Sequence, residues 1–199
     1  MSTILKNQKT SLSKTKKQKQ YTYEDVLKKS ITYFNGDELA ATTWMNKYAI
    51  KDSHGCFVEQ SPDDMHERMA KEFARIEAEY KLKYNLNGSA KFLSKYGQER
   101  DDLTKEKIYD YFKNFGYIIP QGSVMSSLGN PYQLASLSNC IVVPELHDSY
   151  GGVFYTDQQL AQLFKRRCGV GVDISNLRPS GASVSNAAGS TSGAVSFMD

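Results

Sequence analysis

The residues best suited to chemistry lie in the last third of the chain, around two cysteines. Cys140 follows Ser138-Asn139 within an apolar run, and Cys168 stands further along, directly before Gly169-Val170-Gly171. A free cysteine in an apolar strand most often serves as a small buried hydrophobic residue. The alternative is a redox thiol that delivers electrons and forms a disulfide with a second cysteine. Cys168 is one candidate partner, although its place at a turn between a helix and a strand suits packing equally well.

Two further groups, Asp148-Ser149 and Arg178, are suited to binding a nucleotide. A carboxylate accepts hydrogen bonds from a deoxyribose hydroxyl, and a guanidinium donates paired hydrogen bonds to phosphate oxygens. Lys165 could add positive charge, although basic residues in the last turn of a helix are expected from the helix dipole alone. His147 has no accompanying nucleophile, so we interpret it as a surface residue. The Ser- and Gly-rich segment 180–196 is predicted as an ordered loop facing the nucleotide, with a flexible linker as the alternative.

Strands and a helix must position these residues. Apolar runs at residues 117–120, 139–144 and 170–174 predict buried strands, and a capping-box pattern at residues 156–159 predicts the start of a helix. Strand, helix and strand in this order form the unit of a parallel sheet covered on both faces. Gly169-Val170-Gly171 follows the helix, which reverses the dinucleotide-binding order, so we exclude that function. These glycines can still let backbone N–H groups approach a phosphate or a sugar.

Residues 21–117 have the pattern of a helical domain. Helices are predicted to begin at Thr22, after Gly36-Asp37, at Ser61-Pro62 and near Thr104, and the last is predicted to end at Gly116. Apolar residues recur at helical spacing in the third helix and predict one buried face: Met65, Met69, Phe73, Ile76 and Tyr80. We interpret this face as the core of a helix bundle, with a methionine-lined binding groove as the alternative.

The composition excludes several classes of protein. Hydrophobic residues make up 40% and aromatic residues 12% of the 199 residues, which is enough for a packed core. No apolar run approaches the roughly 18 residues of a membrane span, and no signal peptide is evident, so we expect no membrane partner. The three cysteines form no Cys-x-x-Cys pair, so we expect no bound metal and a reducing cytoplasm. Residues 1–20, rich in lysine, are predicted as a disordered basic tail.

The order of these motifs resembles the catalytic subunit of ribonucleotide reductase. The resemblance rests on Ser138-Asn139-Cys140, Asp148-Ser149, the basic helix end, Gly169-Val170-Gly171 and Arg178-Pro179, and it extends over residues 21–199. It includes Ser61-Pro62-Asp63-Asp64-Met65 and Pro120-Gln121-Gly122-Ser123. The resemblance implies a mixed α/β fold, in which a helical domain at residues 21–117 precedes the first strands and helices of a ten-stranded α/β barrel. Residues 118–199 would begin that barrel, which is incomplete in this chain.

The resemblance also implies site residues. Cys140 falls at the first redox cysteine, and the positions facing the substrate are Gly122, Ser123, Asn139 and Gly169. The positions that bind a deoxynucleoside triphosphate effector are Asp148, Ser149, Lys165 and Arg178. In the implied reaction a thiyl radical abstracts the 3′-hydrogen of the ribose, and the 2′-hydroxyl leaves as water. Adenosylcobalamin makes the radical in one class of the family, and a metal-containing partner subunit makes it in another; the absence of an ATP-binding cone favours the cobalamin class.

The family's radical-bearing cysteine, its catalytic glutamate and asparagine, and its second redox cysteine fall beyond Asp199. The resemblance therefore implies an N-terminal fragment, inactive alone, that comes from a split gene, an intein-interrupted gene or a truncation. Its implied partners are the downstream fragment, a second copy at the effector site, thioredoxin or glutaredoxin, and a radical-generating subunit. The alternatives are a standalone nucleotide-binding regulatory module without catalysis and an unrelated α/β enzyme that uses Cys140 as a nucleophile.

Overall fold

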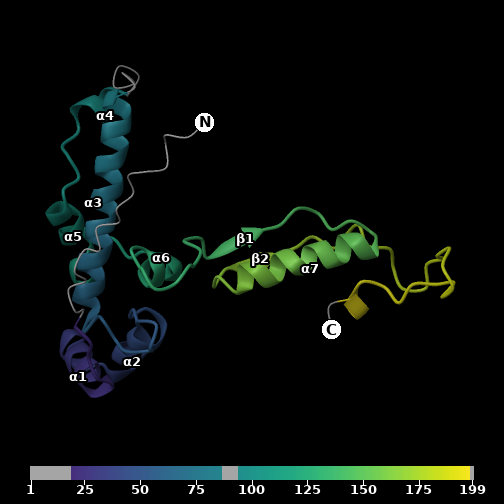
Figure 1. The fold of residues 1–199 in the computed structure, drawn as a ribbon, viewed down its shortest axis with the longest axis horizontal. Helices are drawn as coiled ribbons and strands as arrows, with labels where there is room; N and C mark the ends of the chain where they lie inside the picture. The colour runs from purple at the N-terminus through teal and green to yellow at the C-terminus, as the bar shows by residue number, and fades with distance from the viewer. Residues whose placement is uncertain (1–18, 87–93, 198–199) are drawn as a thin grey trace, which may run out of the picture.

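A helical part and a short α/β part lie side by side in the computed structural model, which describes residues 19–86 and 94–197 (Figure 1). The elements of the helical part are α1 (Tyr23–Tyr33), α2 (Glu38–Lys47), α3 (Pro62–Leu86), α4 (Lys95–Glu99), α5 (Lys105–Phe112) and the 3-10 turn η2 (Lys113–Phe115). The predicted basic tail lies outside the described residues except for Lys19 and Gln20. Gln20 donates a side-chain hydrogen bond to Asp52 at 2.6 Å.

The predicted helix starts in this part are confirmed by their caps. The Thr22 and Thr104 hydroxyls accept hydrogen bonds from the backbone N–H groups of Asp25 and Lys107, and Pro62 occupies the first position of α3. Proline is well tolerated there because the first N–H of a helix has no partner within the helix. The predicted end of the last helix at Gly116 is wrong in detail. The chain leaves α5 at Lys113 and reverses at Asn114, which has a φ of 54°.

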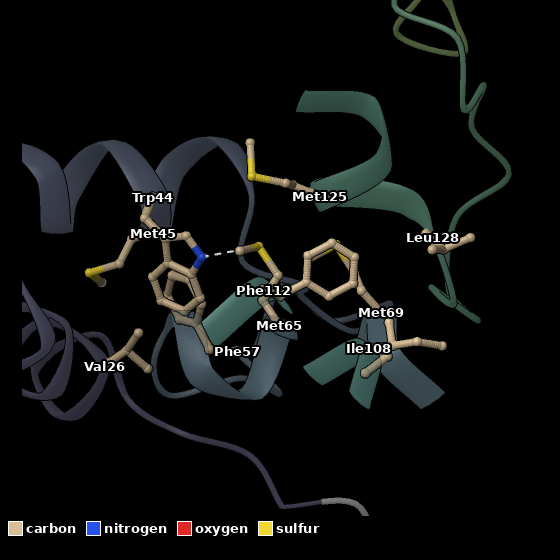
Figure 2. Close-up of a cluster of buried hydrophobic side chains, with 11 residues drawn as sticks. Val26, Trp44, Met45, Phe57, Met65, Met69, Ile108, Phe112, Met125 and Leu128 are labelled. Atoms are coloured by element: carbon tan, nitrogen blue, oxygen red, sulfur yellow. Dashed lines mark hydrogen bonds between the residues drawn. The ribbon is translucent and has the colours of Figure 1, made fainter. Parts of the chain in front are cut away.

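The predicted apolar stripe forms the core of the helical part (Figure 2). Met65 and Met69 are fully buried, whereas Tyr80, at the far end of the stripe, is exposed. The Trp44 indole N–H donates to the Met65 sulfur at 3.4 Å, which connects α2 to α3. The core also takes in Ala70 of the same helix and side chains from outside α3: Val26, Met45, Phe57, Ile108, Phe112, Met125 and Leu128. The stripe is thus a bundle core, as predicted.

The α/β part consists of α6 (Gly122–Ser127), β1 (Cys140–Val142), α7 (Tyr150–Phe164), β2 (Gly169–Gly171) and the 3-10 turn η3 (Val195–Phe197). The two strands pair in parallel, with Cys140 opposite Gly169 and Val142 opposite Gly171. The predicted strand–helix–strand unit is therefore confirmed. Among the described residues the sheet has these two strands and is not closed, as in the beginning of a barrel.

Two predictions about strands are wrong. Residues 117–120 form no strand, and Tyr117 and Ile119 are exposed, because no neighbouring strand in the described part of the chain pairs with them. The run from 139 to 144 does contain β1, but Cys140 and Val142 are exposed instead of buried. Each face of a strand becomes buried only when another layer covers it, and two short strands with one helix cannot cover both faces.

The helix between the strands begins earlier than predicted. The Ser149 hydroxyl accepts from the backbone N–H of Gly152 at 3.0 Å and caps α7, so Thr156, the predicted cap, lies buried in the second turn. Both positions carry a hydroxyl that could cap a helix. The earlier one begins the helix, and in its first turn the backbone at Gly152 passes so close to His147 that a side chain would not fit.

Candidate functional site

Three of the predicted site residues lie close to Cys140 because the parallel strands and α6 meet there. The backbone N–H of Gly169 donates to the carbonyl oxygen of Asn139 at 2.7 Å, which joins the start of β2 to the residue before β1. The backbone N–H of Ser123 donates to the side-chain oxygen of Asn139 at 2.8 Å. Asn139 thus connects α6 to the first strand pair, and the structure brings Ser123, Asn139, Cys140 and Gly169 together.

The glycines at this site allow close packing of the backbone. A Cβ added to Gly169 would lie 3.4 Å from the Cys140 sulfur and 3.3 Å from the Asn139 carbonyl oxygen. A Cβ on Gly122 would lie 3.2 Å from the ring of Tyr48, so the first residue of α6 packs directly against the end of α2. Glycine at position 169 therefore lets the backbone lie close to the Cys140 sulfur, which is itself exposed.

The two cysteines have different surroundings. Cys140 is exposed, whereas Cys168 is buried and its thiol donates to the carbonyl oxygen of Gly169 at 3.3 Å. Gly169 is the register partner of Cys140, and successive residues of an extended chain point to opposite faces. Cys168 therefore lies on the other face of the strand pair, which favours its packing role over a disulfide with Cys140.

A second group of predicted residues lines a cavity of about 380 Å³. The Arg178 guanidinium Nε donates to the Asp148 carboxylate at 2.6 Å, and this ion pair lies where α7 begins at Ser149. The N-terminus of a helix and a guanidinium together favour an anion such as a phosphate. The opposite wall of the cavity comes from Val184, Ser185, Asn186, Ala188, Ser190, Thr191 and Ser192, and Phe197 also lines it.

The Ser-rich segment that supplies this wall is an ordered loop, as predicted. The backbone N–H of Gly181 donates to Thr191 at 2.8 Å, and that of Thr191 donates to Ala182 at 3.0 Å, so the segment folds back on itself. Lys165, in contrast, is not brought to this cavity. It caps the C-terminal end of α7, which has 15 residues and is therefore about 22 Å long, whereas Asp148 lies at the other end.

Residues 19–86 and 94–197 also bear on metal binding and on membrane insertion. Within these ranges no cluster of three or more His, Cys, Asp or Glu residues is arranged to hold a metal ion. The same residues include no helix that is both long and apolar enough to cross a membrane.

Sequence reasoning missed two polar groups in the helical part. Glu59 and Arg68 form a buried ion pair at 2.7 Å, and His66 is fully buried beside the rings of Phe112 and Phe115. The position of His66 between Met65 and Met69 was a usable signal, because it falls on the apolar face of α3. No local pattern relates Glu59 to Arg68, since the residues approach only after α3 has folded against the preceding loop.

Comparisons with known proteins assign both parts of the chain. The family model "Ribonucleotide reductase, all-alpha domain" matches residues 34–133, and "Ribonucleotide reductase, barrel domain" matches residues 138–199. Vitamin B12-dependent ribonucleoside-diphosphate reductases from two strains of Mycobacterium tuberculosis are 28% identical over 159 residues, which cover 80% of this chain and 20% of theirs. The ribonucleoside-diphosphate reductase large subunit of Trypanosoma brucei brucei is 27% identical over 103 residues, 51% of this chain and 12% of the relative. The matched regions thus span 12 to 20% of these relatives' lengths.

Proposed function

The chain belongs to the ribonucleotide reductase large-subunit family, and we propose that it forms the N-terminal part of the catalytic subunit of such an enzyme. The assembled enzyme would reduce ribonucleoside diphosphates to deoxyribonucleotides for DNA synthesis. One observation carries this proposal most strongly. Asn139 holds α6 against the first strand pair, and the exposed Cys140 thiol stands beside Gly169 at that junction.

We assign Cys140 the role of one reducing thiol. In the proposed reaction the ribose C2′–OH bond breaks, oxygen leaves as water, and a hydrogen takes its place on C2′. The two electrons come from Cys140 and a second cysteine outside this chain, which are oxidised together to a disulfide. A dithiol protein such as thioredoxin or glutaredoxin then reduces that disulfide by exchange and is itself oxidised. Gly122, Ser123, Asn139 and Gly169 would hold the substrate beside the thiol.

The radical that begins the reaction would come from adenosylcobalamin or from a metal-containing partner subunit. The B12-dependent relatives favour the first source. Cys140 does not line the cavities of about 180–380 Å³ described at Arg178, Arg68, Tyr155 and Leu160, so these cavities give cobalamin no place beside the thiol. We therefore propose that the radical source lies in another part of the assembled enzyme.

The cavity at Asp148, Ser149 and Arg178 would bind a deoxynucleoside triphosphate effector. Lys165 could contribute only from a second copy of the chain, since it lies at the opposite end of α7. We accordingly propose a homodimer at this site, together with the remaining part of the enzyme as the principal partner. Because the reducing thiols must be regenerated, we place the enzyme in the reducing cytoplasm. Nothing in the described residues favours a regulatory module without catalysis.

The role of Cys140 is tested by Cys140→Ser in the assembled enzyme, with Cys168→Ser as the matched control. Serine is nearly isosteric with cysteine but cannot form a disulfide. We expect Cys140→Ser to abolish multiple turnover with a thiol reductant, whereas Cys168→Ser should retain at least about half of the wild-type rate. Undiminished turnover by the Cys140→Ser enzyme would reduce this residue to a packing role.

A further inference from the structure

Arg68 of α3 donates to three acceptors. One lies in the loop before α3, and two lie about 60 residues further along the chain. Its Nε donates to the carboxylate of Glu59 at 2.7 Å, one terminal nitrogen donates to the carbonyl oxygen of Met125 at 2.7 Å, and the other donates to that of Leu128. Both carbonyls belong to the C-terminal end of α6. The side chain of Arg68 is 13% exposed and that of Glu59 is 6% exposed, so the pair is largely removed from water.

The surrounding residues fix this geometry. Glu59 also accepts from the backbone N–H of Ile50 at 2.9 Å, so its two carboxylate oxygens are both engaged. Gly129, which follows the last turn of α6, has a φ of +71°, and a Cβ there would lie 3.2 Å from the Arg68 stem. A left-handed glycine thus lets the chain turn away directly above the guanidinium.

The other end of α6 is held as well. Gly122 packs against the Tyr48 ring, and the N–H of Ser123 donates to the Asn139 side chain. The helix has six residues, too few to be stable by itself, so its position depends on these contacts and on the burial of Met125 and Leu128. Among these residues, Arg68 is the one that carries a charge, and its hydrogen bonds fix the C-terminal end of α6.

We propose that Arg68, held by Glu59, is a positioning residue that sets α6 and thereby keeps Ser123 against Asn139, the neighbour of Cys140. In this way a residue of the helical part controls the geometry at the junction with the barrel. The link of Arg68 to turnover rests on the proposed function. Arg68 touches no reacting atom. It acts through α6: Arg68 holds the Met125 and Leu128 carbonyls at the end of this helix, and the backbone N–H of Ser123 at its start donates to Asn139.

The positioning role is tested by amide hydrogen exchange of Ser123, measured by mass spectrometry with residue-level fragmentation on the assembled enzyme, in which we expect residues 139–174 to be protected. Removing Arg68 alone leaves Glu59 buried and unpaired, which can unfold the helical part. The decisive variant is therefore Glu59→Gln/Arg68→Met, which removes both charges and keeps an acceptor for Ile50. We expect exchange at Ser123 to accelerate roughly 10-fold, the scale of one lost hydrogen bond, while amides in the middle of α3 stay protected.

Two further variants calibrate the measurement. Asn139→Ala removes the acceptor of the Ser123 N–H directly and should accelerate exchange at that amide at least as much. Arg75→Ala removes an arginine from the exposed surface of α3, where it pairs with Glu72 and Glu79, and should leave Ser123 unchanged. If the folded double variant exchanges Ser123 at the wild-type rate while Asn139→Ala does not, Arg68 does not position α6.

The assembled enzyme then separates this inference from the proposed function. Faster exchange at Ser123 together with a KM for ribonucleotide raised about 10-fold or more, and a smaller change in kcat, supports a positioning role in substrate binding. Faster exchange with unchanged KM and kcat keeps the contact between Arg68 and α6 but refutes the placement of substrate at Ser123. A proportional loss of activity and melting temperature, with no change in KM, would identify Arg68 as a stabilising residue only.

Discussion

Asp148 and Arg178 form an ion pair whose two side chains are 33% and 41% exposed. An exposed pair of this kind contributes at most about 1 kcal/mol to stability, because water solvates both charges well when they are apart. Its place at the start of α7, on the wall of a cavity, is therefore better explained by binding than by folding. The guanidinium can exchange the carboxylate for a phosphate at little cost, and the freed carboxylate can accept from a sugar hydroxyl.

Arg178→Ala should weaken the binding of a deoxynucleoside triphosphate to the assembled enzyme. Loss of a charge-assisted hydrogen bond costs about 1.5–3 kcal/mol, which corresponds to roughly 10- to 150-fold in Kd. Arg166→Ala is the matched control, since Arg166 bonds to Gln162 on the outer side of α7 and does not line the cavity. Calorimetry that finds equal affinities for the wild type and Arg178→Ala would remove Arg178 from the effector site.

His66 should make the stability of the helical part depend on pH. Burial is the main reason that the pKa of His66 falls from an ordinary value of 6.5 to about 4; the nearby Asp63 carboxylate opposes this shift, and the Arg68 guanidinium adds to it. Neither ring nitrogen has a hydrogen-bond partner among the described residues. Between pH 6.5 and 4, His66 is therefore protonated in the unfolded chain but neutral in the folded chain. Stability is complete above pH 6.5 and falls as the pH drops toward 4, by about 3 kcal/mol in total.

His66→Leu should remove this part of the pH dependence, because leucine fills a similar volume and does not titrate. Urea unfolding at pH 7 and at pH 5 should show a smaller difference in unfolding free energy for His66→Leu than for the wild type. His54→Asn, at an exposed histidine, should behave like the wild type. Equal pH dependence in all three proteins would show that His66 keeps an ordinary pKa in the folded chain.

At the scale of elements, the start of α7 lies beside the cavity at Asp148 and Arg178. Gly151 and Gly152 both lie in its first turn, but only Gly152 is tightly enclosed. A Cβ there would lie 2.4 Å from the carbonyl oxygen of His147, whereas one on Gly151 would find its nearest neighbour at 4.0 Å. Alanine is about 1 kcal/mol more favourable than glycine inside a helix, so the two positions should respond in opposite directions.

Gly152→Ala should destabilise the chain, by about 1–3 kcal/mol, because the backbone around His147 must move. Gly151→Ala should be neutral or stabilising by up to about 1 kcal/mol. Chemical denaturation of both variants, followed by circular dichroism, provides the comparison. Equal destabilisation of both would mean that α7 does not begin at Tyr150 with the Ser149 cap.

The elements of the helical part could be predicted well because their signals are local. Thr22, Pro62 and Thr104 act within the first turn of the helices that they begin. The spacing of Met65 and Met69 directly indicates the buried face of α3. The α/β part was harder to predict. Thr156 has the sequence of a cap, but which of two hydroxyls begins α7 is decided by tertiary contacts. The predicted burial of β1 was too high. An apolar strand sequence indicates that the strand is suited to being covered on both faces, but it does not show whether the covering elements are present.

The candidate site was only partly predictable for the same reason. Cys140, Asn139, Gly169 and Ser123 could be named from motifs, and the structure brings them together. The ion pair of Glu59 and Arg68 could not be found, since it depends on α6 packing into the helical core. Residues 118–199 were predicted to begin the α/β part, yet Met125 and Leu128 are buried with side chains of α2, α3 and α5.

At the scale of the whole molecule, the strand pair is only partly covered by other elements. β1 is a three-residue strand with two exposed residues, and α7 carries exposed aromatic side chains at Tyr150, Phe154, Tyr155 and Phe164. Open strand edges and apolar faces favour association with another chain. We expect weak amide protection over residues 139–174 in the 199-residue chain and strong protection after the rest of the enzyme is added. Full protection of this region in a monomer would indicate a self-contained domain.

The most direct test of the account is the conversion of ribonucleoside diphosphate to deoxyribonucleotide by this chain combined with the remaining part of the enzyme. The chain matches only 12 to 20% of the length of its relatives, so neither part should be active by itself. With a thiol reductant and a radical source present, we expect deoxyribonucleotide to form only when both parts are combined. The account is contradicted if the remaining part reaches the same rate without residues 1–199, or if the combined parts bind each other and form no deoxyribonucleotide.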